Sequence, residues 1–384
     1  MATRFDPFQE MDRMLSSLLS AERASATMPM DLYRSGDNYV LHIDLPGADP
    51  GTIDVNVEDR TLTIRAERWP IAGAFVIARG SKTEALVVTA TIEDGEHQGR
   101  GEGVPYPRYG ETVEGATAEI ESVREAVEAG ADRAALQALL PPGAARNAVD
   151  CALWDLDAKL AGVRAWTLAG FQRLDPVKTT YTLSLASPEA MAEQARTVAR
   201  RPILKLKIGG PDDLGRVEAV RAAAPKTRLV VDANEGLGFD NLVRIAPDLE
   251  RLGVKMIEQP LKAGEDEALD GYVCPVPLCA DESFHTGADF EELAGRYQAV
   301  NIKLDKTGGL TEALACRREA DARGLMVMAG CMVSTSLAMA PALLIAQGAE
   351  VVDLDGPLLL AKDREPGLNY LGSMIEPPPA ALWG

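Results

Sequence analysis

The sequence predicts an α/β protein whose main part is a (β/α) TIM-like barrel. Three observations indicate this class. Over residues 176–384, short apolar runs alternate with mostly amphipathic stretches of helical period. Residues 65–175 carry strand-like runs followed by two long helical stretches, the pattern of an α+β capping domain. Residues 1–64 carry short runs of period two between turn residues, which indicates a separate β-rich segment.

The barrel prediction rests on apolar runs of strand length. Parallel strands buried on both faces read as near-continuous apolar runs joined by crossovers. The candidate strands are, in chain order, TTYTLSL, ILKLKI, RLVVDA, KMIEQ, VPLCADE, AVNIKL, LMVMAG and EVVDLD. Because barrel enzymes carry their reactive groups at the carboxyl ends of the strands, we expect the side chains there to share one pocket mouth.

The two preceding segments contribute strands of another type. In the capping domain we expect strands in AFVIARG and EALVVTATIED, a loop in GEGVPYPRYGE, and helices over 112–140 and 144–162. In the first segment, an apolar helical stripe over 5–19 precedes the runs DLYRSG, NYVLHIDLPG, TIDVNVED and TLTIRAER. The last of these could close the first segment or open the capping sheet, so the junction is expected between residues 59 and 69.

The composition excludes some classes of partner. The net charge of −19 and the pI of about 4.7 argue against nucleic acid, whose binding requires a basic face. The five cysteines form no C-x-x-C pair, which fits a reducing compartment better than disulfides or zinc. No run approaches the roughly 20 apolar residues of a membrane span, and the first residues lack the pattern of a signal peptide. We therefore expect a cytoplasmic protein with no membrane partner.

The residues at the expected strand ends recur at a regular spacing, and all but one of them are charged. Their numbers differ by 22 to 27, about one strand plus one helix, in the series Lys207, Asp232, Glu258, Asp281, Lys303, Gly330 and Asp353. Three adjacent carboxylates without a counter-ion would raise one another's pKa. Oxygen-only ligands imply a hard cation, and Mg²⁺ suits three carboxylates with water and substrate oxygens. The predicted metal ligands are Asp232, Glu258 and Asp281.

Lysines frame this predicted metal site. Lys205 and Lys207 lie two apart on one strand, so both point into the barrel. The second ammonium group and a nearby Mg²⁺ should lower the pKa of Lys207 toward that of a working base. Lys303 arrives from the opposite side, and two lysines on either side of one carbon can remove a proton from one face and return it to the other. Lys306, three residues on, is interpreted as a surface lysine.

These residues lie in stretches that resemble the muconate-lactonizing subgroup of the enolase superfamily. Within it, the sequence is similar to L-Ala-D/L-Glu (dipeptide) epimerases and N-acetyl-D-glutamate racemases. The matching stretches run from residue 67 to residue 384: ERWPIAGAFVIARGSKTEA, GEGVPYPRYGE, LPPGAARNAVDCALWDLDAK, KLK, VDANE, EQPL, CADES, NIKLDKTGGLTEAL, GCMVSTSLA and VDLDGP. The resemblance implies one Mg²⁺ per active site, with Lys207 and Lys303 as the acid/base pair and Lys205 in support.

The resemblance also implies how a small substrate, a dipeptide or an N-acyl amino acid, is bound. Asp353 and Asp355 would hold the α-ammonium group of a dipeptide, and the two acids suit a cationic group on chemical grounds alone. Arg79 would pair with a glutamate side chain, and Thr182 would make another substrate contact. The alternatives left open are cycloisomerisation and o-succinylbenzoate synthesis, whose substrates carry no ammonium group. An N-acetylated amino acid carries none either.

Residues 1–64 resemble the start of a bacterial small heat-shock protein. FDPFQEMDRMLSSLL and MPMDLYRSGDNYVLHIDLPGADPGTIDVNVEDRTLTIRAER are similar to its N-terminal arm and the first strands of its α-crystallin sandwich. The later strands do not follow, and half a sandwich leaves open sheet edges. The segment is interpreted as an incomplete fragment. Chaperone or assembly activity through it is the alternative from a different class of function. For the whole chain we expect a homo-oligomer.

Overall fold

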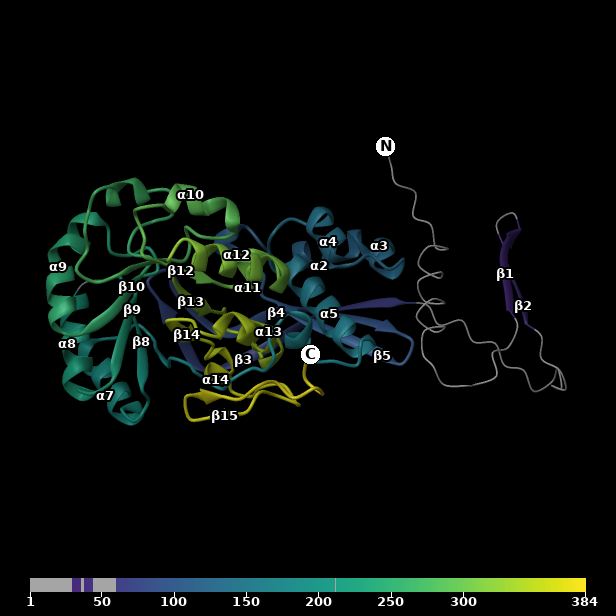
Figure 1. The fold of residues 1–384 in the computed structure, drawn as a ribbon. Helices are drawn as coiled ribbons and strands as arrows, with labels where there is room; N and C mark the ends of the chain where they lie inside the picture. The colour runs from purple at the N-terminus through teal and green to yellow at the C-terminus, as the bar shows by residue number, and fades with distance from the viewer. Residues whose placement is uncertain (1–29, 36–37, 44–59, 211) are drawn as a thin grey trace. The chain divides into compact units, whose positions relative to one another are not determined.

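The computed structural model describes residues 30–35, 38–43, 60–210 and 212–384 (Figure 1). The chain divides into two units, Met1–Val57 and Glu58–Gly384. In the first, β1 (Met30–Ser35) pairs antiparallel with β2 (Asn38–Ile43). This confirms the antiparallel expectation for these two runs. The helical stripe and the TIDVNVED run lie outside the described residues, and the likeness to a heat-shock protein stays a prediction.

The second unit opens with the capping domain. Its antiparallel sheet has the order β3 (Thr61–Ile77), β4 (Gly80–Asp94), β5 (His97–Gly103), so TLTIRAER belongs to this sheet. Helical elements follow: η2 (Pro107–Tyr109), α2 (Val113–Ser122), α3 (Arg124–Glu128), α4 (Arg133–Leu139), α5 (Ala144–Leu160) and α6 (Ala165–Leu168).

Glycines at every second position of β5 let α5 lie directly on the sheet. A Cβ atom at Gly101 would stand 2.1 Å from the carbonyl oxygen of Ala148, and one at Gly103 would stand 2.1 Å from that of Ala144. Real Cβ atoms do not approach so closely, so both positions require glycine. The spacing of two along the strand matches the spacing of four along the helix, which fixes the register of α5 on β5.

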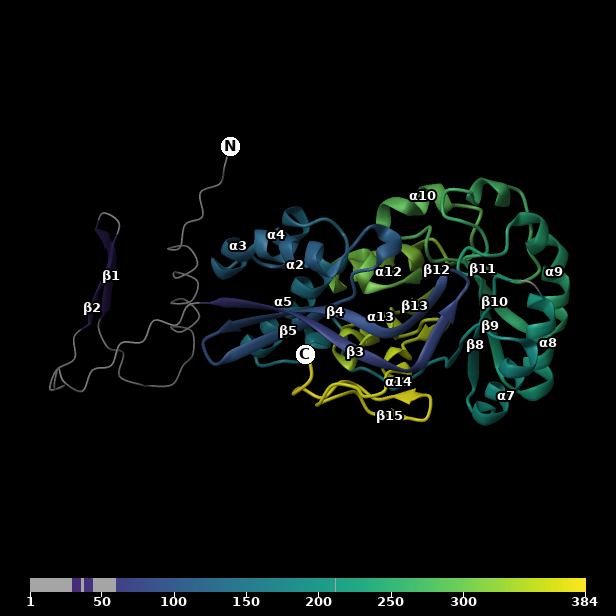
Figure 2. The ribbon, with the colours of Figure 1, turned by 180° about the vertical axis from the view of Figure 1, so that it is seen from behind.

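The eight expected barrel strands are all present and form one parallel sheet that curls on itself (Figures 1 and 2). In order they are β7 (Thr182–Leu183), β8 (Ile203–Lys207), β9 (Arg228–Asp232), β10 (Val254–Glu258), β11 (Leu278–Ala280), β12 (Ala299–Ile302), β13 (Met326–Gly330) and β14 (Val351–Asp353). The Thr180 N–H group donates to the carbonyl of Val352 at 2.8 Å, which brings the two ends of the sheet together. The TIM-like prediction is confirmed.

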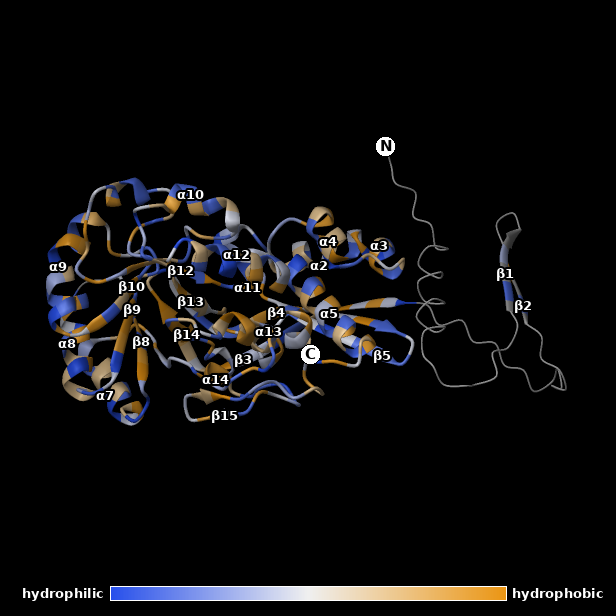
Figure 3. Cartoon of the chain, viewed as in Figure 1, coloured by the Kyte–Doolittle hydropathy of each residue, from blue (hydrophilic) through white to orange (hydrophobic). Residues whose placement is uncertain are grey.

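Helices surround the strands, and Figure 3 colours much of β8 and β9 orange, the colour of hydrophobic residues. They are α7 (Pro188–Val198), α8 (Asp213–Ala223), α9 (Phe239–Arg251), α10 (Phe290–Leu293), α11 (Leu304–Thr307), α12 (Leu310–Ala322), α13 (Ser336–Ala346) and α14 (Gly356–Leu359), with η3 (Asp266–Leu269) and η4 (Gly287–Asp289). Every residue of α13 is buried, because this helix packs on β13 and also on β5. An amphipathic pattern is therefore missing there.

The C-terminal residues tie the barrel back to the capping domain. β15 (Tyr370–Leu371) and β16 (Met374–Ile375) form a small sheet with β6 (Val177–Lys178). The indole of Trp383 is buried and donates to the carbonyl of Cys151 in α5 at 2.9 Å. Among the described residues, no helix combines the length and the apolar character that crossing a lipid bilayer requires.

Candidate active site

The residues predicted from their spacing, all but Gly330 charged, do gather at one face of the barrel. Each stands at the carboxyl end of its strand or directly after it: Lys207, Asp232, Glu258, Asp281, Lys303, Gly330 and Asp353. Asp232 and Glu258 have no exposed surface and Asp281 has 1%, whereas Lys207 keeps 6% and Lys303 keeps 7%. The three acids therefore form the floor of the site, and the two lysines lie nearer to solvent.

The two oxygens of each of these carboxylates have different kinds of partner. One oxygen, which we call the held oxygen, is fixed in a different way in each acid. The Asp232 Oδ1 atom accepts from the N–H group of Asn234 at 2.9 Å. Glu258 Oε1 accepts from the Asn301 amide at 2.8 Å, and Asp281 Oδ1 accepts from Lys306 at 2.6 Å.

The other oxygen of each acid meets only the ammonium groups of Lys205, Lys207 or Lys303, and we call it the lysine-facing oxygen. Asp232 Oδ2 lies 2.6 Å from Lys207 and 3.0 Å from Lys205. Asp281 Oδ2 lies 2.7 Å from Lys303. Glu258 Oε2 lies 2.7 Å from Lys205, but without the direction of a hydrogen bond, so this buried oxygen has no hydrogen-bond partner.

This arrangement fits a hard cation. Within the described part of the chain, no three acidic, histidine or cysteine side chains already enclose a metal-sized space. Instead, three ammonium groups stand among the lysine-facing oxygens, in the place a cation would take. The donors are all oxygen, and the buried Glu258 Oε2 atom has no hydrogen-bond partner. Lysine-facing oxygens of the three acids are thus the groups that would hold Mg²⁺.

The pKa values follow from burial and from these charges. Burial, and after it the negative charge of Asp232, raises the pKa of Glu258 to about 8, as expected for acids that lie close together. For Asp281, burial acts in the same direction, but Lys303 and Lys306 outweigh it and hold the pKa well below its usual range. Burial alone would lower the pKa of Lys303, yet the Asp281 charge raises it well above the ordinary value.

Lys306 is not the surface lysine that the sequence predicts. Its side chain is completely buried. Its ammonium group donates to the Asp281 carboxylate, to the backbone carbonyl of Asp281 and, at 3.0 Å, to the carbonyl of Asn301. The short helix α11 turns back into the protein after Lys303, which carries Lys306 inward rather than into solvent.

The two acids after β14 are not equivalent. The Asp353 carboxylate accepts from Lys205 at 2.7 Å and from the Thr180 hydroxyl at 2.5 Å. Asp355 accepts from Thr182, whose N–H group lies at 2.6 Å and whose hydroxyl also supports the carboxylate. Among the described residues, Asp355 has no cation within ion-pair distance and is 3% exposed. Burial, and then the Asp353 charge, raise its pKa to about 7.

Arg79 reaches the site from the tip of the β3–β4 hairpin. It pairs with Glu282 at 2.6 Å and with Glu235 at 2.8 Å, and it also donates to the carbonyl of Asn234. Arg108, from η2, binds both oxygens of Glu235 at 2.9 and 2.7 Å. Sequence reasoning missed Glu235, Glu282 and Arg108. The two glutamates could have been found, since each follows a predicted metal ligand within three residues.

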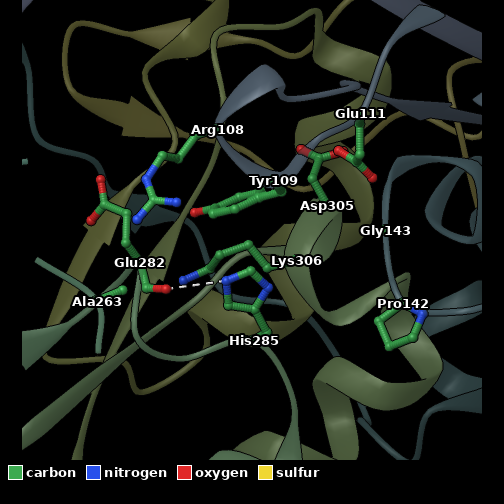
Figure 4. Close-up of a pocket in the computed structure, with 10 residues that line it drawn as sticks. All are labelled: Arg108, Tyr109, Glu111, Pro142, Gly143, Ala263, Glu282, His285, Asp305 and Lys306. Carbon is green, nitrogen blue, oxygen red and sulfur yellow. Dashed lines mark hydrogen bonds between the residues drawn. The ribbon is translucent and has the colours of Figure 1, made fainter. Parts of the chain in front are cut away.

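A cavity of about 490 Å³ adjoins the acids on the side of Lys306 (Figure 4). Tyr109 lies across it, between Arg108 on one side and Asp305 on the other. Its lining residues come from both domains: Arg108, Tyr109, Glu111, Pro142, Gly143, Ala263, Glu282, His285, Asp305 and Lys306. The site is therefore built where the capping domain meets the mouth of the barrel.

A barrel with lysines and acids at its strand ends, next to an α+β capping domain, is an arrangement that known protein families share. The N-terminal domain model of mandelate racemase / muconate lactonizing enzyme matches residues 59–170, and the enolase C-terminal domain-like model matches residues 190–365. The chain belongs to the enolase superfamily.

Its relatives narrow the class to isomerases. The chain is 46% identical over 313 residues to an L-Ala-D/L-Glu epimerase of Escherichia coli (strain K12), covering 81% of this chain and 98% of the relative. It is 43% identical over 300 residues to an N-acetyl-D-glutamate racemase of Pseudoalteromonas sp, covering 78% and 95%. On this evidence the chain is an isomerase of the epimerase and racemase type.

Solved structures agree. An enolase family member from Agrobacterium tumefaciens with homology to dipeptide epimerases, with bound sodium and L-Ala-L-Glu, superimposes with a TM-score of 0.84 at 54% identity. The match covers 85% of this chain and 100% of that one. Two further solved dipeptide epimerases, 26% and 27% identical, are complexed with Mg and a dipeptide.

Proposed function

We propose that this enzyme is a Mg²⁺-dependent epimerase that inverts the α-carbon of a glutamyl residue by proton transfer between two lysines. The observation that carries the proposal is the placement of Lys207 and Lys303. Lys207 ends β8 and Lys303 follows β12, which stands four places further round a sheet of eight strands. The two ammonium groups therefore face each other across the site, on either side of the predicted metal ligands.

The proposed chemistry follows from the position of the two lysines on opposite sides of the site. When bound, Mg²⁺ would supply the positive charge that stabilises the negative charge developing on the substrate carboxylate as its α-proton leaves. One lysine takes the proton from one face of the carbon, and the other returns a proton to the opposite face, so the configuration inverts. Lys205 pairs with Asp353, which is not a predicted metal ligand, and holds positive charge next to Lys207.

The substrate is proposed to be a dipeptide of the L-Ala-D/L-Glu type in preference to an N-acylglutamate. Among the residues that the structure describes, none gives the buried Asp355 carboxylate a cationic partner, and an α-ammonium group supplies one. Arg79, at the hairpin tip, is proposed to pair with the glutamyl side chain. Thr182 is proposed to act indirectly, by fixing Asp355 through two hydrogen bonds. Cycloisomerisation and o-succinylbenzoate synthesis leave Asp355 unpaired, which disfavours them.

Deuterium exchange tests this proposal directly. The enzyme, L-Ala-L-Glu and Mg²⁺ are incubated in D₂O, and the glutamyl α-proton is followed by NMR; N-acetyl-glutamate is treated in parallel. We expect loss of the α-proton signal and appearance of the L-Ala-D-Glu diastereomer. If neither compound takes up deuterium at that carbon, the proposed reaction is wrong. Exchange with N-acetyl-glutamate alone would agree with the proposed proton transfer but would overturn the choice of a dipeptide as the substrate.

A further inference from the structure

Lys306 differs from the other lysines of the site in what it touches. The ion pairs and hydrogen bonds of the ammonium groups of Lys205, Lys207 and Lys303 go to carboxylates. Lys306 donates two hydrogen bonds to backbone carbonyls, those of Asp281 and Asn301, and one to the held oxygen of Asp281. An ammonium group has three N–H donors, so all of them are engaged. A lysine bound in this way has no donor left for a substrate.

The backbone that carries Lys306 is fixed as well. Its helix α11 is anchored to the capping domain at both ends. The Asp305 carboxylate accepts from the N–H group of Val104 and from the Asn147 amide, both at 2.8 Å. Arg146 donates to the carbonyls of Thr307 at 2.7 Å and of Gly308 at 3.0 Å. The position of the ammonium group is therefore set by two domains together.

We propose that Lys306 is a positioning residue for the metal. Its ammonium group fixes the Asp281 carboxylate so that one oxygen is turned away and the other is presented to Mg²⁺. This inference rests on the proposed metal-dependent function. Asn234 and Asn301 do the same for the other two ligands with neutral groups, but only Lys306 does so with a charge.

The positive charge of Lys306 also balances the charge of the proposed metal site. Three ionised ligands and one Mg²⁺ leave one negative charge in a place where the acids are at most 1% exposed. A buried charge is costly unless it is paired, and the fixed Lys306 ammonium balances it. The Asp353 carboxylate already pairs with Lys205. Like Lys205, Lys306 therefore carries a positive charge that need not move during turnover.

Metal affinity, measured apart from activity, tests the proposal. The full chain and its Lys306→Met variant are titrated with Mg²⁺ in a calorimeter, without substrate. Outer partners of metal ligands typically contribute a factor of about 10–100 to affinity, so we expect the Kd of Lys306→Met to rise by that factor. Lys306→Gln keeps two N–H donors without the charge, and its Kd should lie between the two.

Lys303→Met is the matched control. It also removes an ammonium group from Asp281, but from the lysine-facing oxygen, so we expect Mg²⁺ to bind at least as tightly while epimerisation is lost. A folded Lys306→Met variant with the Kd of the unchanged protein overturns the inference. If the unchanged protein itself binds no Mg²⁺, the proposed function fails, and the inference fails with it.

A second measurement needs no variant and applies if Lys306→Met does not fold. The unchanged protein is treated with an amine acetylating reagent, with and without Mg²⁺, and the labelled peptides are mapped. Lys306 should stay unlabelled in both states, whereas the exposed Lys262 is labelled. Labelling of Lys306 as fast as Lys262 in the folded protein would contradict its fixed position.

Discussion

The sharpest prediction concerns Asp355→Asn, which removes one negative charge and keeps the shape of the side chain. The structure sets the magnitude. Burial and the neighbouring Asp353 raise the pKa of Asp355 from 3.8 to about 7, and each pKa unit corresponds to about 1.4 kcal/mol. Relative to a carboxyl group in water, ionisation of Asp355 therefore costs about 4 kcal/mol more when no ligand is bound. Two charges about 4 Å apart at an effective dielectric constant of about 20 attract by about 4 kcal/mol, so an ammonium group offsets that cost.

We expect Asp355→Asn to lower kcat/KM for L-Ala-L-Glu by about 100- to 1000-fold, because truncating one partner of a buried charge pair costs about 2–5 kcal/mol. Exchange at N-acetyl-glutamate, which has no ammonium group, should change less than about threefold. Both rates are followed by NMR in D₂O at pH 8. Asp353→Asn is the control: it releases Lys205, so it should slow both compounds equally. An equal loss with both compounds in Asp355→Asn would refute the assignment.

The same group predicts a pH dependence. Asp355 faces Asp353 on its own turn, Lys205 from β8, Cys331 after β13 and Tyr370 of β15. Its pKa in the folded protein is raised, so the carboxylate is progressively protonated as the pH falls below about 7. Since the ammonium group needs the carboxylate, KM for the dipeptide should rise as the pH is lowered from 8 to 6. KM for N-acetyl-glutamate should not rise over the same pH range. A parallel rise with both compounds would show that a group other than Asp355 causes the pH dependence.

Further predictions concern the chemistry and the fold. Lys207→Ala and Lys303→Ala should each abolish epimerisation, as seen by a chiral assay of product, and any exchange that remains should occur from one diastereomer only; full turnover in either variant contradicts the two-base mechanism. Gly101→Ala should lower the free energy of unfolding by about 1–3 kcal/mol or more in guanidinium, because the added methyl group meets the carbonyl of Ala148 at 2.1 Å. Gly210→Ala, where the nearest atom is 3.9 Å away, should change it by less than about 0.5 kcal/mol.

Much of the barrel could be predicted because its signals are local. An apolar run followed by one charged residue, repeated every 22 to 26 residues from Lys207 to Lys303, marks both the strand and its functional end. Other parts depend on contacts between distant segments. The apolar helix α13 shows no amphipathic pattern because β5 of the capping sheet covers its outer side. Likewise, the stretch TLTIRAER reads as a strand in either neighbour, and only its pairing with β4 assigns it to the capping sheet.

The roles of the lysines show the limit of spacing most clearly. Lys303 and Lys306 are three residues apart, and both contact the Asp281 carboxylate, at 2.7 and 2.6 Å. Spacing alone would treat them as one pair. They differ in which oxygen they meet and in what else they bind, because Lys306 also donates to the carbonyl groups of Asp281, directly after β11, and of Asn301 in β12. A lysine held by backbone carbonyls is fixed in place, whereas one held only by a lysine-facing oxygen is released when that oxygen takes another cation. We therefore assign the proposed proton transfer to Lys303 and not to Lys306.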